Sequence, residues 1–489
     1  MTTPASRVPQ QIPSPSRPAS EHASPAPTVS RPPLPRAGAR AYAHLYSEWL
    51  WPAWERFARR RATVEHLALL ERSQWASPED IERRQLASLR ALLAHAGEHV
   101  PYWRETFRRL GFDVRDVRRR EDLAALPVLT REMILERYAD LVDPALAPKN
   151  LKKATSGSTG VPLRFEYSHE SECWRQAAKL LGWGWAGYRA GLPTLHYWAR
   201  LHVLPPGARG LKMRVDRALK REIFVDSMRQ DEEGRRHALM ELRRLRPAVI
   251  VCFTQSLAQF ARWVLDRGLR DWDDIAVLCG AEAVLPGDRA ALVRAFGPHV
   301  FETYGSRETM LMASECEAHD GLHLMEENVL VEIARGGAPL PAGESGDVVV
   351  TDLHNYGMPF IRYANGDVAR MATDRPCACG RGLRKLASVE GRRAETLTDG
   401  EGNPLPGIVV HPLFVDPEAE VARQFQLIQR RGGAVVLRVV KGRDWSVERM
   451  EPKLRELRQY LRGQPLRVEY VDAILPGPSG KLRTVFVER

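Results

Sequence analysis

The feature that most constrains the fold is a repeat of strand, helix and strand in the middle of the chain. Val249–Phe253 is a run of five apolar residues, and Leu257–Leu265 has apolar positions at helical spacing. Ile275–Cys279 and Val300–Tyr304 are predicted as the next two strands. Strands joined through a helix pair in parallel within one sheet, so this pattern predicts an α/β fold with a parallel core.

The segments on either side of this core have other patterns. Between Glu82 and Ala94 leucines recur at three- and four-residue spacing, which predicts an amphipathic helix, and Thr130 is expected to cap another. Gly346–Thr351 is expected to belong to a β subdomain. Near the C-terminus we predict a hairpin over 425–440, a helix over 447–461 and a strand over 466–471, which together make a small α+β domain.

These patterns divide the chain into three parts. Residues 1–38 are rich in Pro, Ser and Ala and are expected to form a disordered tail, because they cannot bury enough apolar surface. Residues 39–391 are expected to form a large N-terminal domain with parallel sheets and a β subdomain, preceded by a helical start over 39–149. Residues 392–489 are expected to form a small, mobile C-terminal domain.

The composition excludes several classes of protein. The 489 residues contain six cysteines, too few for a disulfide scaffold, so a cytoplasmic location is expected. No apolar run reaches the roughly 18 residues of a membrane span. The net charge of +11 favours anionic ligands such as ATP or coenzyme A (CoA), but no motif for specific nucleic-acid binding is present.

A loop rich in Gly, Ser and Thr stands out between the helical start and the α/β core. It comprises Thr155, Ser156, Gly157, Ser158, Thr159 and Gly160. Backbone N–H groups and hydroxyls in such a loop can surround phosphate oxygens, although the same composition is typical of surface loops. It is not a Walker loop, because no Gly-Lys-Ser/Thr sequence closes it.

This loop resembles the phosphate loop of the adenylate-forming superfamily of acyl-CoA synthetases and ligases. Five further motifs of that family follow in the same order. They are Gly280-Ala281-Glu282, Tyr304-Gly305-Ser306-Arg307-Glu308, Arg362-Tyr363-Ala364-Asn365-Gly366-Asp367, Gly391-Arg392 and Gly480-Lys481. The helical start and the Cys377-Ala378-Cys379-Gly380 segment resemble the phenylacetate–CoA ligase-like branch, which includes the CapK-type biosynthetic proteins.

The resemblance implies an enzyme that activates a carboxylic acid with ATP, releasing pyrophosphate, and passes the acyl group to CoA. The residues implied to bind ATP or AMP are Thr155–Gly160, Gly280, Ala281, Glu282, Tyr304, Gly305, Ser306, Asp367 and Arg392. Glu308 is implied to bind Mg²⁺, because a hard cation prefers carboxylate and phosphate oxygens. Lys481, Glu308 and Arg362 are the implied catalytic residues.

The segment after Arg392 departs from the ligase pattern. Ala394 and Glu395 stand where the ligases have two acidic residues, and Arg483 comes one place early in the terminal motif. This leaves an alternative open, in which an amine, a hydroxyl group or a carrier protein accepts the acyl group, as in CapK-type proteins. A catalytically inactive scaffold with the same fold is a further alternative. Five aromatic residues are candidates for the acid pocket: Trp183, Trp185, Tyr197, Trp198 and Phe253.

Four residues are candidate ligands of a structural zinc ion. Cys377 and Cys379 lie on one tight turn, and Cys316 and His323 lie upstream. Three thiolates and an imidazole complete a tetrahedral zinc site, although unrelated buried thiols and a surface histidine also explain the spacing. The phenylacetate–CoA ligase-like branch has a similar arrangement, which favours zinc, and His319 is the alternative histidine ligand.

Overall fold

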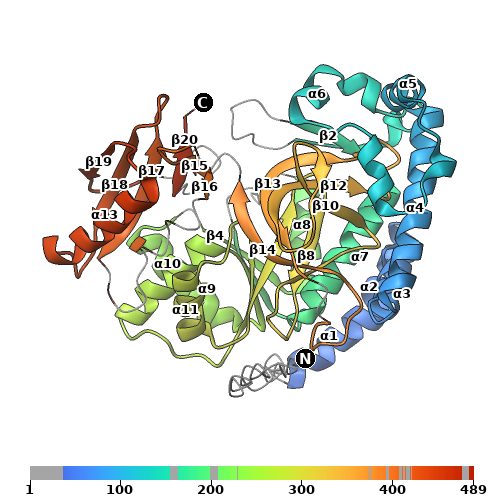
Figure 1. Cartoon of the computed structure of the whole chain (residues 1–489). Coiled ribbons are helices and arrows are strands. Elements are labelled where there is room, and N and C mark those ends of the chain that lie inside the picture. Colours follow the sequence, from blue (N-terminus) through green and yellow to red (C-terminus); the bar gives the residue numbers. More distant parts are fainter. Residues whose placement is uncertain are drawn as a thin grey trace, which may run out of the picture.

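The computed structural model describes residues 37–154, 163–198, 207–227, 229–373, 376–392, 396–402, 404–406, 410, 413–414, 419, 421–475 and 484–488. One mixed sheet forms the centre of the molecule, with helices packed around it (Figure 1). The helical start (blue) lies on one side of this sheet, and the C-terminal four-stranded sheet (red) lies on the opposite side (Figure 1). None of the helices within the described ranges is long and apolar enough to cross a membrane.

The helical start begins with one continuous helix over residues 37–58, made of α1, η1, α2 and η2. The helices that follow are α3 (Thr63–Ser73), α4 (Pro78–His99), α5 (Pro101–Leu110) and α6 (Arg131–Glu136). Ser77 caps α4 by accepting a hydrogen bond from the Asp80 amide, and Gly111 ends α5 in the left-handed conformation. Thr130 caps α6, as predicted.

Five strands form the parallel half of the sheet, in the order β4-β3-β5-β6-β7. They are β3 (Thr194–Trp198), β4 (Glu222–Asp226), β5 (Val249–Phe253), β6 (Ala276–Gly280) and β7 (Val300–Ser306). The helices of this half are α7 (His169–Trp185), α8 (Ala208–Lys220), α9 (Glu232–Leu245), α10 (Thr254–Asp266) and α11 (Pro286–Phe296). β4 is added on one side of β3, whereas β5, β6 and β7 are added on its other side. The order of the strands therefore reverses between β3 and β5, and open α/β sheets bind their ligands at such a switch point.

The antiparallel half continues the same sheet in the order β7-β8-β9-β14-β13-β12-β10-β11. Its strands are β8 (Met310–Glu315), β9 (Leu322–Leu324), β10 (Val329–Arg335), β11 (Ala338–Pro339), β12 (Ser345–Asp352), β13 (Tyr363–Met371) and β14 (Lys385–Arg392). The strands predicted as a β subdomain continue the parallel half, because β7 pairs with β6 on one edge and with β8 on the other. The two halves therefore form one twelve-stranded sheet.

Two short strands precede the parallel half. β1 (Leu151–Ala154) and β2 (Arg164–Tyr167) are antiparallel, and Ala154 stands opposite Arg164 at the end of the pair. The sequence between them contains the candidate phosphate loop.

The C-terminal segment forms its own four-stranded sheet, in the order β19-β18-β17-β20. Its elements are β17 (Ala422–Gln429), β18 (Val435–Lys441), α13 (Val447–Leu461), β19 (Leu466–Tyr470) and β20 (Val485–Val487), with a small β15 (Thr396–Thr398) and β16 (Pro404–Pro406) before them. The predicted hairpin, helix and strand are all confirmed. The buried cluster of this segment is drawn from residues 397–485 alone.

Candidate functional site

The carboxyl ends of the parallel strands carry an aromatic pair. Trp198 ends β3 and Phe253 ends β5, and their rings stack with centroids 4.2 Å apart. Gly280 ends β6 beside them, and a Cβ there would lie 3.1 Å from Thr303 Oγ1 and 3.5 Å from the Trp198 ring. A glycine at this position therefore keeps the strand ends close together.

The loop after β6 is anchored to the start of α10. Ala281 has a φ of +65°, in the left-handed region, which turns the chain sharply at the end of the strand. Glu282 Oε2 accepts a hydrogen bond from the Gln255 amide at 3.0 Å, and Thr254 Oγ1 donates to the Glu282 carbonyl at 3.1 Å. The carboxylate of Glu282 thus positions this loop against the positive end of a helix.

Tyr304, Asn365 and Asp367 form one hydrogen-bonded cluster. Tyr304 is buried on β7, and its hydroxyl donates to Asp367 Oδ2 at 2.9 Å. Asn365 Nδ2 donates to the same carboxylate oxygen at 3.0 Å and to the Tyr304 hydroxyl at 2.8 Å, while Asn365 Oδ1 accepts from the Asp367 amide. Two sequence motifs that are 63 residues apart therefore meet at one carboxylate.

Glu308 lies in the turn between β7 and β8 and is buried. The Tyr363 hydroxyl donates to Glu308 Oε1 at 3.4 Å, and burial and this carboxylate raise the pKa of Tyr363, so the hydroxyl stays protonated. Ser306 holds the turn by accepting from the Thr309 amide at 3.3 Å. Gly305 is equally constrained, because a Cβ there would lie 2.0 Å from the Met310 carbonyl oxygen.

Arg362 does not join this cluster. Its guanidinium is buried and pairs with Glu332 on β10, with Nη2 and Oε1 3.0 Å apart. The remaining donors reach the carbonyl oxygens of Ala124, Leu126 and Gly337. The structure therefore places the guanidinium in a network between β10, β13 and the helical start.

Several predicted site residues lie outside the described residues. These are Thr155, Ser156, Gly157, Ser158, Thr159, Gly160 and Lys481. The side chain of Arg392 is also outside them, but its backbone pairs with Asp367 across β13 and β14. Strand register thus places Arg392 directly beside the Tyr304–Asp367 cluster.

Glu302 is a half-buried carboxyl group that was not predicted. It lies on β7 two residues before Tyr304, and its Oε1 accepts from the Val284 amide at 3.4 Å in the loop after β6. Burial and the nearby Glu315 carboxylate raise the pKa of Glu302 to about 7. A titratable group thus lies between the two predicted nucleotide-binding segments.

The four predicted zinc ligands are brought together. The ligand atoms of Cys316, His323, Cys377 and Cys379 all lie within 4.8 Å of one another. The sulfurs of Cys316 and Cys377 are 3.7 Å apart, and Cys379 Sγ lies 3.2 Å from His323 Nε2. Two thiolates on a tetrahedral zinc ion, each at about 2.3 Å, are separated by about 3.8 Å, so the set fits zinc.

Neighbouring residues orient these ligands. His323 Nδ1 lies 3.0 Å from the Leu383 carbonyl oxygen, which leaves Nε2 as the ligand atom. His319 lies instead beside Glu315, at 3.2 Å. Arg381 donates to Gln74 at 2.8 Å and pairs with Glu317 at 2.9 Å. The cluster therefore joins the segments around β8 and β9 to the segment before β14. Arg381, in this last segment, contacts the end of α3 through Gln74.

Two contacts at the site were not predicted from the sequence. Asn365 and Tyr363 lie inside the Arg362–Asp367 motif, but the sequence predicted functional roles only for Arg362 and Asp367. Trp198 was one of five aromatic candidates, and only Trp198 and Phe253 of those five stack at the strand ends. Tyr197 belongs to the core, Trp185 packs near His323 and Trp183 contacts Tyr188. The alternation of side chains along β3 was the available signal.

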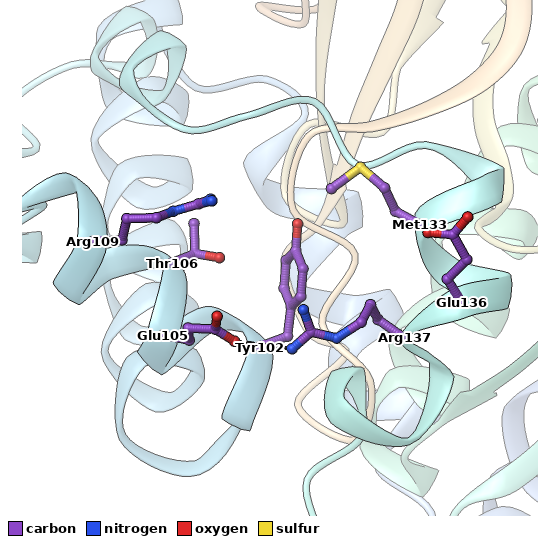
Figure 2. Close-up of a pocket in the computed structure, with 7 residues that line it drawn as sticks. All are labelled: Tyr102, Glu105, Thr106, Arg109, Met133, Glu136 and Arg137. Carbon is purple, nitrogen blue, oxygen red and sulfur yellow. Dashed lines mark hydrogen bonds and ion pairs between the residues drawn. The ribbon is translucent and has the colours of Figure 1, made fainter.

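Two clefts lie away from the strand ends. One, of about 230 Å³, is lined by Tyr102, Glu105, Thr106, Arg109, Met133, Glu136 and Arg137 (Figure 2). There Arg137 packs over the Tyr102 ring and pairs with Glu105 and Asp140. The other, of about 680 Å³, includes Asp347, Arg362 and Gly366 and thus borders the turn before Asp367.

The chain is similar in sequence to known ligases. No protein-family model matches the chain. It is 29% identical over 394 residues to a phenylacetate–coenzyme A ligase of Thermus thermophilus, an alignment covering 78% of this chain and 84% of the relative. It is 25% identical over 386 residues to the phenylacetate–coenzyme A ligase of Escherichia coli, covering 74% and 82%.

Solved structures share the fold. The 2-hydroxyisobutyryl-CoA ligase, in the postadenylation state with 2-HIB-AMP, matches with a TM-score of 0.69 at 18% identity, over 86% of this chain and 92% of the other. The same ligase in the thioesterification state, with 2-HIB-AMP and CoA, matches with a TM-score of 0.55 at 19% identity. The chain therefore has the fold of the adenylate-forming ligases and is related in sequence to the phenylacetate–coenzyme A ligases.

Proposed function

We propose that this protein uses ATP to convert a carboxylic acid into an acyl-adenylate, with release of pyrophosphate, and then transfers the acyl group to CoA. The cluster of Tyr304, Asn365 and Asp367, with Glu308 in the adjoining turn, carries this proposal. It lies beside the carboxyl ends of the parallel strands, where α/β folds bind nucleotides. The relatedness to phenylacetate–CoA ligases supports the same reaction.

The residues of the cluster have complementary roles toward ATP. The Asp367 carboxylate accepts hydrogen bonds from the ribose hydroxyls, and Tyr304 and Asn365 hold it in place. The Tyr304 ring stacks on adenine, beside the Gly280–Glu282 loop. Arg392, opposite Asp367 in the strand ladder, reaches the ribose or the phosphates.

In this proposal the Thr155–Gly160 loop and Glu308 both act on the phosphates of ATP. Glu308 holds Mg²⁺, which neutralises phosphate charge when bound. The Tyr363 hydroxyl orients the Glu308 carboxylate by its hydrogen bond. Lys481 supplies a compact positive charge to the transferring phosphoryl group.

The chemistry is two successive substitutions. A carboxylate oxygen of the acid attacks the α-phosphorus of ATP, and the bond to the bridging oxygen breaks as pyrophosphate leaves. The CoA thiol then attacks the acyl carbon, loses its proton, and AMP leaves. Trp198 and Phe253 form one wall of the acid pocket, because they stack at the strand ends next to Gly280.

A second acceptor is supported by the hinge sequence. Ala394 stands where the ligase pattern has an acidic residue, which favours a CapK-type protein whose acyl-adenylate reacts with an amine, a hydroxyl group or a carrier protein. Transfer to CoA and transfer to another acceptor share the same adenylation step, so an assay with and without CoA distinguishes the two acceptors.

Zinc at Cys316, His323, Cys377 and Cys379 has a structural role in this proposal. Four protein ligands fill a tetrahedral coordination sphere, which leaves no position for water or substrate. The ion therefore holds the segments that carry its ligands and takes no part in acyl transfer.

Pyrophosphate release tests the function. The purified protein is assayed with ATP, Mg²⁺ and a panel of acids that includes phenylacetate and 2-hydroxyisobutyrate, with and without CoA. We expect release that depends on the acid, formation of a CoA thioester, and a large loss of rate in Lys481→Ala with little change in ATP affinity. Release that is insensitive to CoA, with the acyl-adenylate trapped by hydroxylamine, would identify another acceptor. Absence of release with every acid would support the scaffold alternative.

A further inference from the structure

Two neighbouring helical segments expose an unusual number of large apolar side chains. Their exposed fractions range from 42% for Trp54 to 81% for Phe57. We call this surface the apolar face, and its members are Leu45, Trp49, Leu50, Trp54, Phe57, Leu211, Val215 and Leu219. Single exposed apolar residues are common on soluble proteins, but eight on two adjoining helices require a partner.

The two segments lie side by side and antiparallel. The Tyr42 hydroxyl donates to the Leu219 carbonyl at 2.7 Å near the start of the first helix. Lys212 Nζ lies 6.0 Å from the Trp54 ring centroid near its end. Leu211, Val215 and Leu219 recur every four residues, so they form one stripe along α8. Figure 1 shows α1 and α2 along the outer edge of the molecule.

The same segments carry most of the net charge of the protein. Residues 37–61 and 207–221 contain eleven Lys or Arg and three Asp or Glu, a net charge of +8. Residues 1–36 add +3, and the other 413 residues contain 57 basic and 57 acidic residues. The whole net charge of +11 is therefore accounted for by the two segments that carry the apolar face and by residues 1–36.

This combination selects one kind of partner. Exposed Trp, Phe and Leu on a helix that also carries Lys and Arg are typical of segments that lie in the interface of a membrane. Cations near the surface of anionic lipids each add to the attraction. A second copy of the chain would bring +8 against +8, which opposes association. Residues 1–36 contain four Ile, Leu or Val residues and are basic themselves, so they are poorly suited to cover the face.

We propose that the apolar face binds the surface of a bilayer that contains anionic lipids. Trp49 and Phe57, the most exposed of its aromatic residues, enter the interface between head groups and acyl chains. Arg40, Arg60, Lys212 and Arg214 are exposed on the same segments, Arg61 is half-buried beside Arg60, and these basic residues contact lipid phosphates. The protein then lies on the membrane without crossing it. This inference does not depend on the proposed enzymatic reaction.

Sedimentation of the full-length protein with vesicles tests the proposal. One set of vesicles contains phosphatidylglycerol and phosphatidylcholine, and the other contains phosphatidylcholine alone. We expect binding to the anionic vesicles, weaker binding as salt is added, and little binding to the neutral vesicles. Absence of binding to the anionic vesicles would overturn the proposal.

Matched variants test the site. Arg60→Glu/Arg61→Glu should lower the partition coefficient at least about thirtyfold, at about fivefold for each basic residue lost. Arg108→Glu/Arg109→Glu makes the same change of net charge on α5 and should keep binding within about threefold of wild type. Equal losses in the two charge variants would show that only overall charge matters and would contradict the proposal.

The apolar residues need their own control. Trp49→Ser/Phe57→Ser should lose most binding, whereas Met240→Ser, which alters a residue 56% exposed on α9, should not. Thermal unfolding checks that each variant is folded, and sedimentation velocity reports its oligomeric state. A wild-type dimer that these two serines dissociate would assign the face to a second copy instead.

Discussion

At the scale of single residues, Glu302 is a half-buried acid whose ionisation is opposed by its surroundings. The folded protein retains its proton up to about pH 7, whereas the unfolded chain releases it near 4.5. The folded state therefore loses stability as the pH rises through this interval. Glu302 also lies between the Gly280–Glu282 loop and Tyr304, the two segments that we propose to bind the nucleotide.

We expect Glu302→Gln to remove this pH dependence. Glutamine keeps an oxygen acceptor for the Val284 amide but cannot ionise. Its advantage over wild type in unfolding free energy should grow by up to about 3 kcal/mol between about pH 4 and about pH 8. Urea unfolding at both pH values measures this change. Glu98→Gln, at an exposed carboxylate, is the control, and an advantage of equal size at both pH values would contradict the prediction.

Arg362 allows a test of structural against catalytic roles. Arg362→Met leaves the Glu332 carboxylate buried without its partner and should destabilise the protein by about 3–5 kcal/mol. Arg362→Met/Glu332→Leu replaces both charges and should regain most of that stability. We expect this double variant to keep pyrophosphate release, because the guanidinium contacts Glu332 and carbonyl groups in the structure. Restored stability without activity would instead place Arg362 in catalysis.

At the scale of elements, the turn between β7 and β8 connects residues that we propose to bind the nucleotide. Gly305→Ala would put a methyl group 2.0 Å from the Met310 carbonyl oxygen, so the two strands must separate. We expect a loss of about 1–3 kcal/mol in stability and weaker ATP binding, because Tyr304 and Glu308 flank this glycine. Gly184→Ala on α7 has open space around it and should be close to neutral. Unfolding and ATP titration of both variants check this.

The Cys/His cluster connects elements from three parts of the sequence. We expect one zinc ion per chain, and Cys379→Ser should lower the zinc content and the melting temperature together, because the ion joins the turn after Cys377 to β9. Cys173→Ala, at a buried thiol outside the cluster, should keep its zinc. Metal analysis and thermal unfolding measure both quantities, and full zinc retention in Cys379→Ser would rule out this ligand set.

At the scale of the whole molecule, the C-terminal segment has a core of its own. Leu457 on α13 is fully buried among residues 397–485, whereas Leu292 is buried in the parallel half of the large sheet. Separate cores can unfold separately, which is the behaviour expected of the proposed boundary near residue 392.

Calorimetry of two core variants tests this boundary. We expect two unfolding transitions, one for the C-terminal segment and one for the large domain. Leu457→Ala should lower the free energy of unfolding of the C-terminal segment, and Leu292→Ala that of the large domain, each by about 2–5 kcal/mol. If either variant shifts both transitions equally, the chain unfolds as a single unit and the proposed division is incorrect.

The strands of the parallel core and the C-terminal elements were predictable, because their signals are local. Val249–Phe253 is apolar at every position, and Met450, Leu454, Leu457 and Leu461 recur at helical spacing. The strands around residues 310–392 were mostly missed, since they are mixed in polarity and stabilised by pairing partners far away in sequence.

The sequence by itself determined the α/β class, the order of the nucleotide-binding motifs and the identity of four candidate zinc ligands. Only the tertiary structure decided that Tyr304 and Asp367 share a hydrogen bond, and that Tyr363 rather than Arg362 faces Glu308. It also placed the apolar stripe of α8 beside the helix over residues 37–58. The physical reason is that composition and periodicity act within one element, whereas contacts between elements depend on sheet register and packing.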